Sequence, residues 1–333
     1  MKRLLVPLFA ATACLMSATA GSAADVFPSK SVTIVIPFTA AGPSDAVGRL
    51  LAKTMAVSLG QPVNIENIAG GGGSTGAGKV AKSPADGYTL LLHHFAHAAS
   101  KALYPSLTFD PVKDFEPIGL VSYGPYVLVA RTSLPIKNAE QALKYIRDNK
   151  EKVSFGHAGI GSGSHLSNML LMSALGKVKF TEKAYRGTGP AMMDLAAGQI
   201  DFLFDQTVGA AQFIKAGTVR PLAVTSLTRL DALKETPTLQ EVGLKGFEVT
   251  QWFALYAPKG TPKPALDKLA VALEAAIKDP ANESKFAEYG TLLFQPGKRG
   301  PADARKKLEA EVVRWRKIVK DAGAEVKDSK ATK

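Results

Sequence analysis

The chain of 333 residues has a single cysteine, Cys14, and it lies in a segment that we expect to be removed. Residues 1–24 have the features of a secretory signal peptide, because Lys2 and Arg3 precede an apolar stretch at 4–15 and small residues follow. The remaining 309 residues (333 minus 24) contain no thiol. This excludes disulfides, a cysteine nucleophile and cysteine metal ligands from the mature protein.

Long hydrophobic runs are also missing. The apolar stretch at 4–15 is too short to span a bilayer core of about 30 Å, and no later segment reaches the ~18 apolar residues of a membrane helix. We therefore expect a soluble mature chain that is stabilised by a buried core. A chain of this length usually divides into two domains.

Acidic residues are fewer than basic ones, which gives a formal charge of +12, or +10 once Lys2 and Arg3 are removed. The basic residues cluster late, at 306–307, 314–320 and 327–333, where the pattern predicts a solvated helix face and tail. No basic strand interleaved with aromatic residues is present, so we expect no nucleic-acid partner.

Short β-rich runs alternate with longer helical patterns, which predicts an α/β fold with mostly parallel sheets. Strands are expected at 32–37, 63–68, 88–93, 115–121, 126–130, 153–156, 182–185, 201–204, 221–225 and 249–257. Helices are expected at 43–59, 76–82, 138–149, 165–175, 190–197, 264–277 and 302–322. The long β segments predict that the chain crosses twice between lobe 1 (25–125 plus 251–333) and an inserted lobe 2 (126–250), with a ligand cleft between them.

The glycine run at 70–73 continues as Ser74-Thr75-Gly76-Ala77-Gly78-Lys79 and fits three catalytic patterns. A phosphate-binding loop would need a hydroxyl where Val80 stands. A dinucleotide-binding turn arises by chance in any glycine run. A hydrolase nucleophile at Ser74 would need a base and an acid that nothing nearby supplies. A flexible loop that leads into a helix is the preferred interpretation, and the catalytic ones stay open as alternatives.

Turns of small residues join strands to helices at 36–45, 156–165 and 185–190. Each turn leaves backbone N–H groups without intrahelical partners, and these donors and the helix dipole suit a carboxylate. In the first turn, Ser44 or Asp45 is placed to cap the helix. The turns follow strand ends in both predicted lobes, so we expect them to meet at one crevice.

The five histidines form two groups, with His93, His94 and His97 after one strand and His157 and His165 around the second turn. They are interpreted as polar lining of the cleft, with a zinc site through His93 and His97 as the alternative. Protonation near pH 6 would place positive charge around an anionic ligand, which predicts tighter binding at pH 5.5 than at 8.

Taken together, the motifs resemble the Bug proteins, the extracytoplasmic solute receptors of tripartite tricarboxylate transporters. The resemblance covers essentially the whole mature chain. It is carried by Phe27-Pro28-Ser29-Lys30, residues 32–38, Gly42-Pro43-Ser44-Asp45, Gly60-Gln61-Pro62-Val63, residues 70–76, residues 84–90, Ala102-Leu103-Tyr104-Pro105, Tyr185-Arg186-Gly187, Pro190, Asp194-Leu195, residues 198–201 and residues 257–264.

The resemblance implies a type 2 periplasmic-binding-protein fold that closes around a carboxylate held by backbone amides, hydroxyls and waters. It implies ligand contacts from Phe38, Thr39, Ala40, Ala41, Gly161, Ser162, Ser164, Tyr185, Arg186, Gly187, Thr188 and Asp205. The chain departs from its relatives at 93–97, where His94 and His97 stand in place of small residues. This difference favours a ligand that needs bulkier or aromatic side chains around it.

The expected function is therefore capture of a dicarboxylate or an aromatic carboxylate in the periplasm and its delivery to membrane permease subunits. We expect a monomer without enzyme activity, cofactor or metal. A sensory binding protein with a signalling partner is one alternative. An exported hydrolase or metal enzyme that uses Ser74 or the histidines is another.

Overall fold

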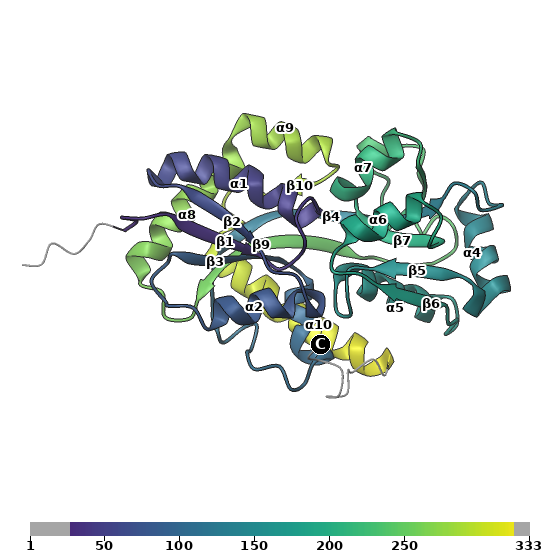
Figure 1. The fold of residues 1–333 in the computed structure, drawn as a ribbon, viewed down its shortest axis with the longest axis horizontal. Helices are drawn as coiled ribbons and strands as arrows, with labels where there is room; N and C mark the ends of the chain where they lie inside the picture. The colour runs from purple at the N-terminus through teal and green to yellow at the C-terminus, as the bar shows by residue number, and fades with distance from the viewer. Residues whose placement is uncertain (1–26, 323–333) are drawn as a thin grey trace, which may run out of the picture.

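A computed structural model describes residues 27–322 and shows an elongated molecule in two parts, joined by strands that run through both (Figure 1). The predicted signal peptide and most of the basic tail lie outside the described residues. Within residues 27–322, no helix combines the length and apolar character needed to cross a membrane.

The first part is built on a mixed sheet in which β1 lies between two parallel neighbours, β2 and β3. Its strands are β1 (Val32–Ile36), β2 (Val63–Asn67), β3 (Thr89–His94), the short β10 (Leu292–Leu293), and portions of β4 (Phe115–Arg131) and β9 (Thr250–Pro258). The strand β9 runs antiparallel to both β3 and β4.

The second part continues the same sheet through β4, in the order β4-β7-β5-β6. Its strands are β5 (Ser154–His157), β6 (Thr181–Ala184), β7 (Phe202–Gln206) and β8 (Val219–Val224). The strands β5, β6 and β7 are mutually parallel, whereas β4 is antiparallel to β7 and β8. The sheet is thus mixed, and the expectation of mostly parallel strands holds only away from the two long strands.

The strand β4 changes partners along its length. Residues 115–125 pair with β9, and residues 126–131 pair with β7 and β8. We propose the lobe boundaries at these residues and call the part around β1 lobe 1 and the part around β5 lobe 2. The chain then enters lobe 2 along β4 and returns along β9, so the hinge is a pair of hydrogen-bonded strands.

Helices cover both faces of the sheet (Figure 1). They are α1 (Pro43–Leu59), α2 (Ser74–Ala81), α3 (Ala96–Leu103), α4 (Ala139–Asn149), α5 (Gly163–Ala174), α6 (Thr188–Ala196), α7 (Thr207–Lys215), α8 (Lys263–Lys278), α9 (Pro280–Glu288) and α10 (Pro301–Ala322), with short 3-10 turns η1 (Gly71–Gly73), η2 (Lys150–Lys152) and η3 (Asp231–Leu233). The sequence did not predict α3, α7, α9 or β10.

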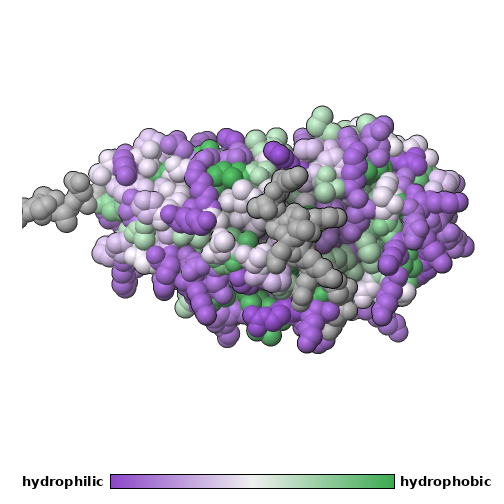
Figure 2. All heavy atoms as spheres, turned by 60° about the horizontal axis from the view of Figure 1, so that its bottom comes forward, coloured by the Kyte–Doolittle hydropathy of each residue, from purple (hydrophilic) through white to green (hydrophobic). Residues whose placement is uncertain are grey.

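The core of lobe 1 follows from strand alternation. Ile34 and Ile36 of β1 face one side, where they pack in a cluster with residues of α1 and α8 such as Leu51 and Leu269. Val35 faces the opposite side, toward α2 and α3. Because both faces of β1 are covered, the strand is apolar along most of its length, as parallel strands usually are. Outside, hydrophilic side chains dominate the visible surface and the hydrophobic ones form small groups (Figure 2).

Candidate ligand-binding cleft

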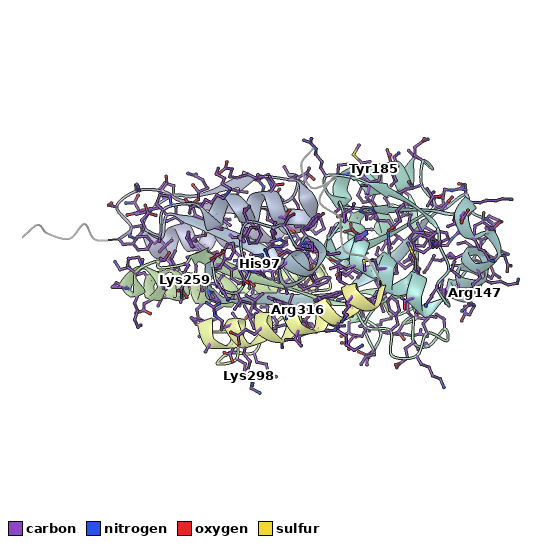
Figure 3. The ribbon with its side chains drawn as sticks, turned by 90° about the horizontal axis from the view of Figure 1, so that it is seen from below. His97, Arg147, Tyr185, Lys259, Lys298 and Arg316 are labelled. Atoms are coloured by element: carbon purple, nitrogen blue, oxygen red, sulfur yellow. The ribbon has the colours of Figure 1, made fainter. Side chains whose placement is uncertain are left out.

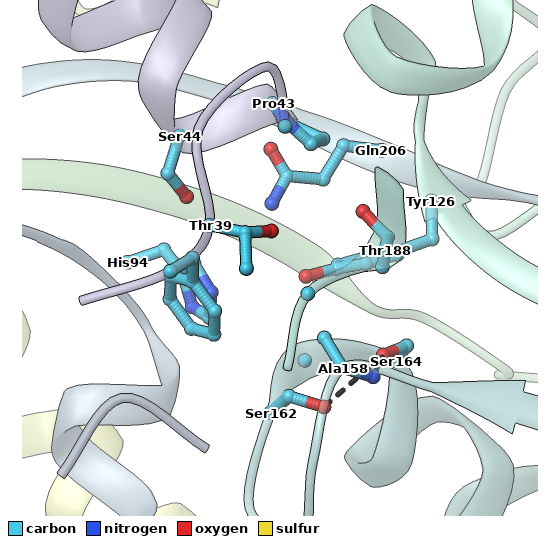
Figure 4. A pocket seen from close by; sticks show the side chains of 14 residues that line it. Thr39, Pro43, Ser44, His94, Tyr126, Ala158, Ser162, Ser164, Thr188 and Gln206 are labelled. Carbon is cyan, nitrogen blue, oxygen red and sulfur yellow. Dashed lines mark hydrogen bonds between the residues drawn. The ribbon is translucent and has the colours of Figure 1, made fainter. Parts of the chain in front are cut away.

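A small cavity lies between the two lobes where strands end and helices begin, and its volume is about 20 Å³. Figure 4 shows Thr39 and Ser44 on one side of the gap and Thr188, Ser162 and Ser164 on the other. The residues that line it are Phe38, Thr39, Gly42, Pro43, Ser44, His94, Tyr126, Ala158, Ser162, Gly163, Ser164, Gly187, Thr188 and Gln206.

Four helices begin at this cavity. The residues that precede α1, α5, α6 and α7 are Gly42, Ser162, Gly187 and Gln206, and all four line the space. The first N–H groups of a helix have no intrahelical partner, and the helix dipole concentrates partial positive charge at the same end. The cavity therefore collects backbone donors from both lobes around one point.

None of the fourteen residues that line this space is Asp, Glu, Lys or Arg. Two polar side-chain atoms at the cavity, the Thr39 Oγ1 and the Gln206 Oε1, are buried without a hydrogen-bond partner. A buried polar atom without a partner costs roughly 1–3 kcal/mol, so a ligand or water that bonds to these atoms offsets that cost. The arrangement suits a polar guest, because dipoles rather than fixed charges surround it.

The turn that supplies Ser162 and Ser164 is held by its own hydrogen bonds. The Ala158 N–H donates to the Ser164 Oγ at 2.9 Å, and the two serine hydroxyls lie 3.1 Å apart (Figure 4). The Ser162 Oγ also accepts the His165 N–H at 3.3 Å, which caps α5. These hydrogen bonds fix both hydroxyls at the cavity wall.

His94 forms an aromatic wall with Phe38, since the two rings stack at 4.9 Å with an interplanar angle of 15°. Its Nδ1 accepts the Ala96 N–H at 3.2 Å, which assigns the ring proton to Nε2 in the neutral form. Burial lowers the pKa of His94 to about 3. The other lobe repeats this pattern, because burial lowers the pKa of His157 to about 4 and that of His165 to about 3.

These pKa shifts correct the expectation that histidine protonation tightens binding at pH 5.5. In this conformation the histidines are neutral at pH 5.5 and at pH 8, because their positive form would lose its hydration on burial. His94 can still act as a neutral Nε2–H donor.

Asp205 is buried beside the cavity at the end of β7. Its neighbour in sequence, Gln206, lines the cavity and donates its N–H to the Asp205 Oδ1 at 2.8 Å. Burial raises the pKa of Asp205 to about 7, against smaller opposing effects of hydrogen bonds from Thr188 and Gln206. The Asp205 carboxyl group therefore contacts a residue of the cavity wall without lining the cavity itself, and its charge changes near neutral pH.

Seven of the fourteen residues predicted for the site line the cavity. They are Phe38, Thr39, His94, Ser162, Ser164, Gly187 and Thr188. They come from both lobes, and a side chain on Gly187 would collide with the Thr39 hydroxyl. The lobes are thus in direct contact around the cavity.

The other seven predicted residues do not line the cavity. Asp205, described above, is one of them. Ala40 and Ala41 are exposed, and the Ala41 N–H donates to the Asp45 Oδ2 at 2.9 Å. Gly161 packs on Leu103 and Tyr104 of lobe 1.

His97 is fully buried inside lobe 1, where its ring meets the ring of Phe115 at 4.7 Å (Figure 3). The hydroxyl of Tyr185 donates to Asp194 of α6 at 2.6 Å, and the Arg186 side chain is exposed. The Tyr185 hydroxyl is thus satisfied by a local partner, whereas both ring nitrogens of His97 are buried without a hydrogen-bond partner, away from the cavity.

The cavity contains seven residues that the sequence did not single out as contacts, namely Gly42, Pro43, Ser44, Tyr126, Ala158, Gly163 and Gln206. Five belong to two of the three turns that were recognised, so their neighbourhood was predicted although their roles were not. Tyr126 lies on the crossing strand β4 and Gln206 precedes a helix that was not predicted, so no local motif signalled either.

The predicted cap of α1 is different in detail. The N-cap is Gly42, and no side chain caps the helix. The Asp45 Oδ2 instead accepts the Ala41 N–H at 2.9 Å and the Arg49 Nε–H at 2.8 Å. Ser44 is consequently left to line the cavity.

The catalytic alternatives gain no support from these contacts. Ser74 begins α2 and lies with Thr75 along an outer groove, and Lys79 is paired with Glu66 at 2.6 Å. His93 and His97 approach with ring centroids 5.2 Å apart, but among the described residues no group of three or more His, Cys, Asp or Glu side chains could hold a metal.

Comparison with known proteins identifies the family. Residues 47–324 match the profile of the tripartite tricarboxylate transporter family receptor. The chain belongs to this family. Its members are periplasmic solute-binding receptors and not enzymes, which confirms the resemblance to Bug proteins and the expected absence of an enzymatic role.

Relatives and solved structures agree. A UPF0065 protein of Agrobacterium vitis, encoded in the TAR-I ttuE-ttuC′ intergenic region, is 44% identical over 93% of this chain and 91% of its own. The protein BugT of Bordetella pertussis is 32% identical over 98% of this chain and 99% of its own.

The structure of the periplasmic binding protein BugD superposes with a TM-score of 0.87 at 40% identity, covering 90% of this chain and 99% of its own. MatC from Rhodopseudomonas palustris, with bound malate, gives a TM-score of 0.85 at 37% identity, over 88% of this chain and 100% of its own. A second R. palustris protein, with adipate, gives 0.84 at 33% identity, over 89% and 98%. The predicted periplasmic-binding-protein fold is confirmed.

Proposed function

We propose that this receptor captures a small dicarboxylate in the cavity between its lobes. The observation that carries the proposal is the meeting of four helix N-termini at an uncharged, polar cavity. Backbone N–H groups and partial positive charge at helix ends favour a carboxylate. The malate and adipate bound by two relatives of known structure support a ligand with two carboxylates.

One carboxylate of the solute would accept hydrogen bonds from the N-termini of α5 and α6 in lobe 2, and the other from the α1 turn in lobe 1. Thr39 and Gln206 hold buried polar atoms without partners, and these would bond the solute directly or through water. Contacts from both lobes make binding and closure one event.

An aromatic carboxylate is the second candidate, and the stacked pair of Phe38 and His94 favours it. A planar ring could lie against this wall while its carboxylate reaches the helix N-termini.

The test is calorimetric titration of the mature protein with malate, succinate, adipate and benzoate, using uncharged amides of the same acids as controls. We expect saturable one-to-one binding of a carboxylate, unchanged by a chelator, with no chemical conversion of the solute. Binding of the amide as tightly as the acid, or turnover of the solute, would contradict the proposal.

We further propose that residues 1–24 direct export, that the mature receptor is a periplasmic monomer, and that it delivers its solute to membrane permease subunits. Family membership supports the compartment and the transporter. Uptake of the identified solute by cells with and without the receptor gene distinguishes transport from a sensory role, because a sensor would alter signalling and leave uptake unchanged. Light scattering at micromolar concentration tests the monomer.

A further inference from the structure

The lobes also meet outside the cavity, through a contact that the proposed binding site does not use. The hydroxyl of Tyr104, at the end of α3 in lobe 1, donates to the Ile160 carbonyl of lobe 2 at 2.7 Å. Tyr104 is 7% exposed and does not line the cavity. This hydrogen bond between the lobes, which is partly buried, can exist only while they are closed.

The glycine run provides the space for this contact. Gly72 lies in η1 with φ of +60°, and a Cβ built there would collide with the Ile160 carbonyl oxygen and lie 2.7 Å from the Ser162 nitrogen. Both atoms are backbone of the other lobe, so neither can move aside cheaply. The turn of lobe 2 also lacks a side chain at this contact, because Gly159 faces Gly72 and a Cβ on Gly159 would lie 3.2 Å from the Gly72 nitrogen.

The same turn forms the cavity wall. Ile160 is two residues before Ser162, whose hydroxyl lines the cavity and caps α5. The Ser162 N–H donates to the Gly159 carbonyl at 3.0 Å, which closes residues 159–162 into a tight turn. A turn of this size moves as one body, so a solute held at Ser162 also fixes the position of the Ile160 carbonyl.

We propose that Tyr104 and Gly72 form a closure latch with the turn at 159–162, and that this latch sets the lifetime of the closed receptor without touching the solute. The proposal rests on the proposed function, because it assigns to the latch part of the affinity for the carboxylate. Tyr104 is a positioning residue in this scheme, and Gly72 is the residue whose missing side chain lets the lobes meet.

The test uses two pairs of variants. Tyr104→Phe removes the hydroxyl that bonds across the lobes, whereas Tyr88→Phe removes one that bonds to Ser29 within lobe 1, at 2.8 Å. Gly72→Ala adds a side chain against the opposite lobe, whereas Gly60→Ala adds one at a similar φ of +67° with nothing within 4 Å. Backbone strain is therefore common to both glycine variants, and only the collision differs.

We expect Tyr104→Phe to weaken binding of the carboxylate identified by calorimetry about three- to tenfold, through faster dissociation. We expect Gly72→Ala to weaken it at least a hundredfold, and both control variants to bind within twofold of wild type. The melting temperature of the solute-free protein should be the same for Tyr104→Phe and Tyr88→Phe, which a merely structural role of Tyr104 would not produce.

A second measurement does not depend on affinity. Because the mature chain lacks cysteine, spin labels can be attached through Val57→Cys in α1 and Met193→Cys in α6, which are 83% and 67% exposed. Distances between the labels report the closed fraction, with and without malate. The short distance should lose population in Tyr104→Phe, vanish in Gly72→Ala and persist in the controls.

Equal closed fractions in all variants, or a wild type with no short distance under either condition, would overturn the latch. If wild type binds no carboxylate while Gly72→Ala still abolishes the short distance, the proposed function fails and the latch stands. If wild type and both latch variants bind the carboxylate equally well, the proposed function stands and the latch fails.

Discussion

At the scale of single residues, the site depends on side chains whose polar atoms have no partner inside the protein. Thr39 is half-buried, yet its Oγ1 is sealed from solvent at the cavity. Threonine in a strand-to-helix turn is common, so the sequence could identify the turn but could not show that this hydroxyl faces the opposite lobe.

Thr39→Val should weaken binding of the carboxylate by about tenfold. Valine keeps the shape of the side chain and removes one hydrogen bond, which is worth roughly 1–1.5 kcal/mol. Titration calorimetry measures the change. Thr33→Val in β1, a half-buried position that does not line the cavity, is the control and should leave the affinity unchanged.

Asp205→Asn tests the buried carboxyl group. The pKa of Asp205 is about 7 in the folded protein and 3.8 ordinarily, so between these values the folded state retains a proton that the unfolded chain has released. The free energy of unfolding therefore falls as pH rises through this window, by about 1.4 kcal/mol per unit, and stops falling above about pH 7.

Asparagine cannot lose a proton, so Asp205→Asn should gain stability relative to wild type by about 2–3 kcal/mol between pH 5 and pH 8. Denaturant unfolding at the two pH values measures this difference. Asp148→Asn, on an exposed part of α4 where Asp148 pairs with Lys144, should show no such gain. A gain of the same size in both variants would refute the assignment.

At the scale of elements, the helix N-termini determine where the helices begin and line the candidate cavity. The sequence predicted α1 with its observed bounds, because proline at the first position, a glycine after the last and apolar spacing all agree. It missed α7, whose sequence TVGAAQFIK contains a glycine and β-branched residues and lacks a capping side chain. Because α7 was not predicted, Gln206, which precedes it, was not predicted as a site residue either.

The helix α9 was missed despite a clear signal. Asp279 accepts the N–H groups of Ala281 and Asn282 at 2.9 and 3.1 Å, and Pro280 opens the helix. Aspartate followed by proline is a typical helix start, so this omission could have been avoided. The helix α3 offered no comparable signal, because the histidine run before it reads equally well as strand or loop.

Ser162→Ala should lower both stability and affinity. The hydroxyl caps α5 and also lines the cavity, so its loss should cost about 1 kcal/mol of unfolding free energy and several-fold in affinity. Asn138→Ala is the matched control, since Asn138 caps α4 by accepting the Gln141 N–H at 2.9 Å. It should cost similar stability with unchanged affinity, as measured by thermal unfolding and calorimetry. Affinity loss in both variants would show that stability alone controls binding.

At the scale of the whole molecule, two long strands hold the lobes together. The sequence predicted β4 as a long, nearly continuous β segment made of two runs, 115–121 and 126–130, and left Ser122-Tyr123-Gly124-Pro125 between them unassigned. In the structure Gly124 and Pro125 pair with Gln251 and Thr250, and the chain continues straight into lobe 2. Proline is tolerated there because β4 exchanges one set of neighbours for another at this point.

Binding should make the receptor more compact and more stable at the same time. At a solute concentration one hundred times the dissociation constant, the gain in unfolding free energy should be about 2.7 kcal/mol. Small-angle scattering should show a smaller radius of gyration with solute. A rise in melting temperature without any compaction would mean that the lobes are already closed when the solute enters.

The absence of formal charge from the cavity wall has a consequence for release. A receptor that grips an anion with arginine or lysine must break an ion pair in a water-poor space before it can hand over its cargo. In the proposed binding mode the grip comes from main-chain dipoles, which water replaces as soon as the lobes part. We therefore expect unloading at the proposed permease to require only that the lobes open, at the speed of that opening.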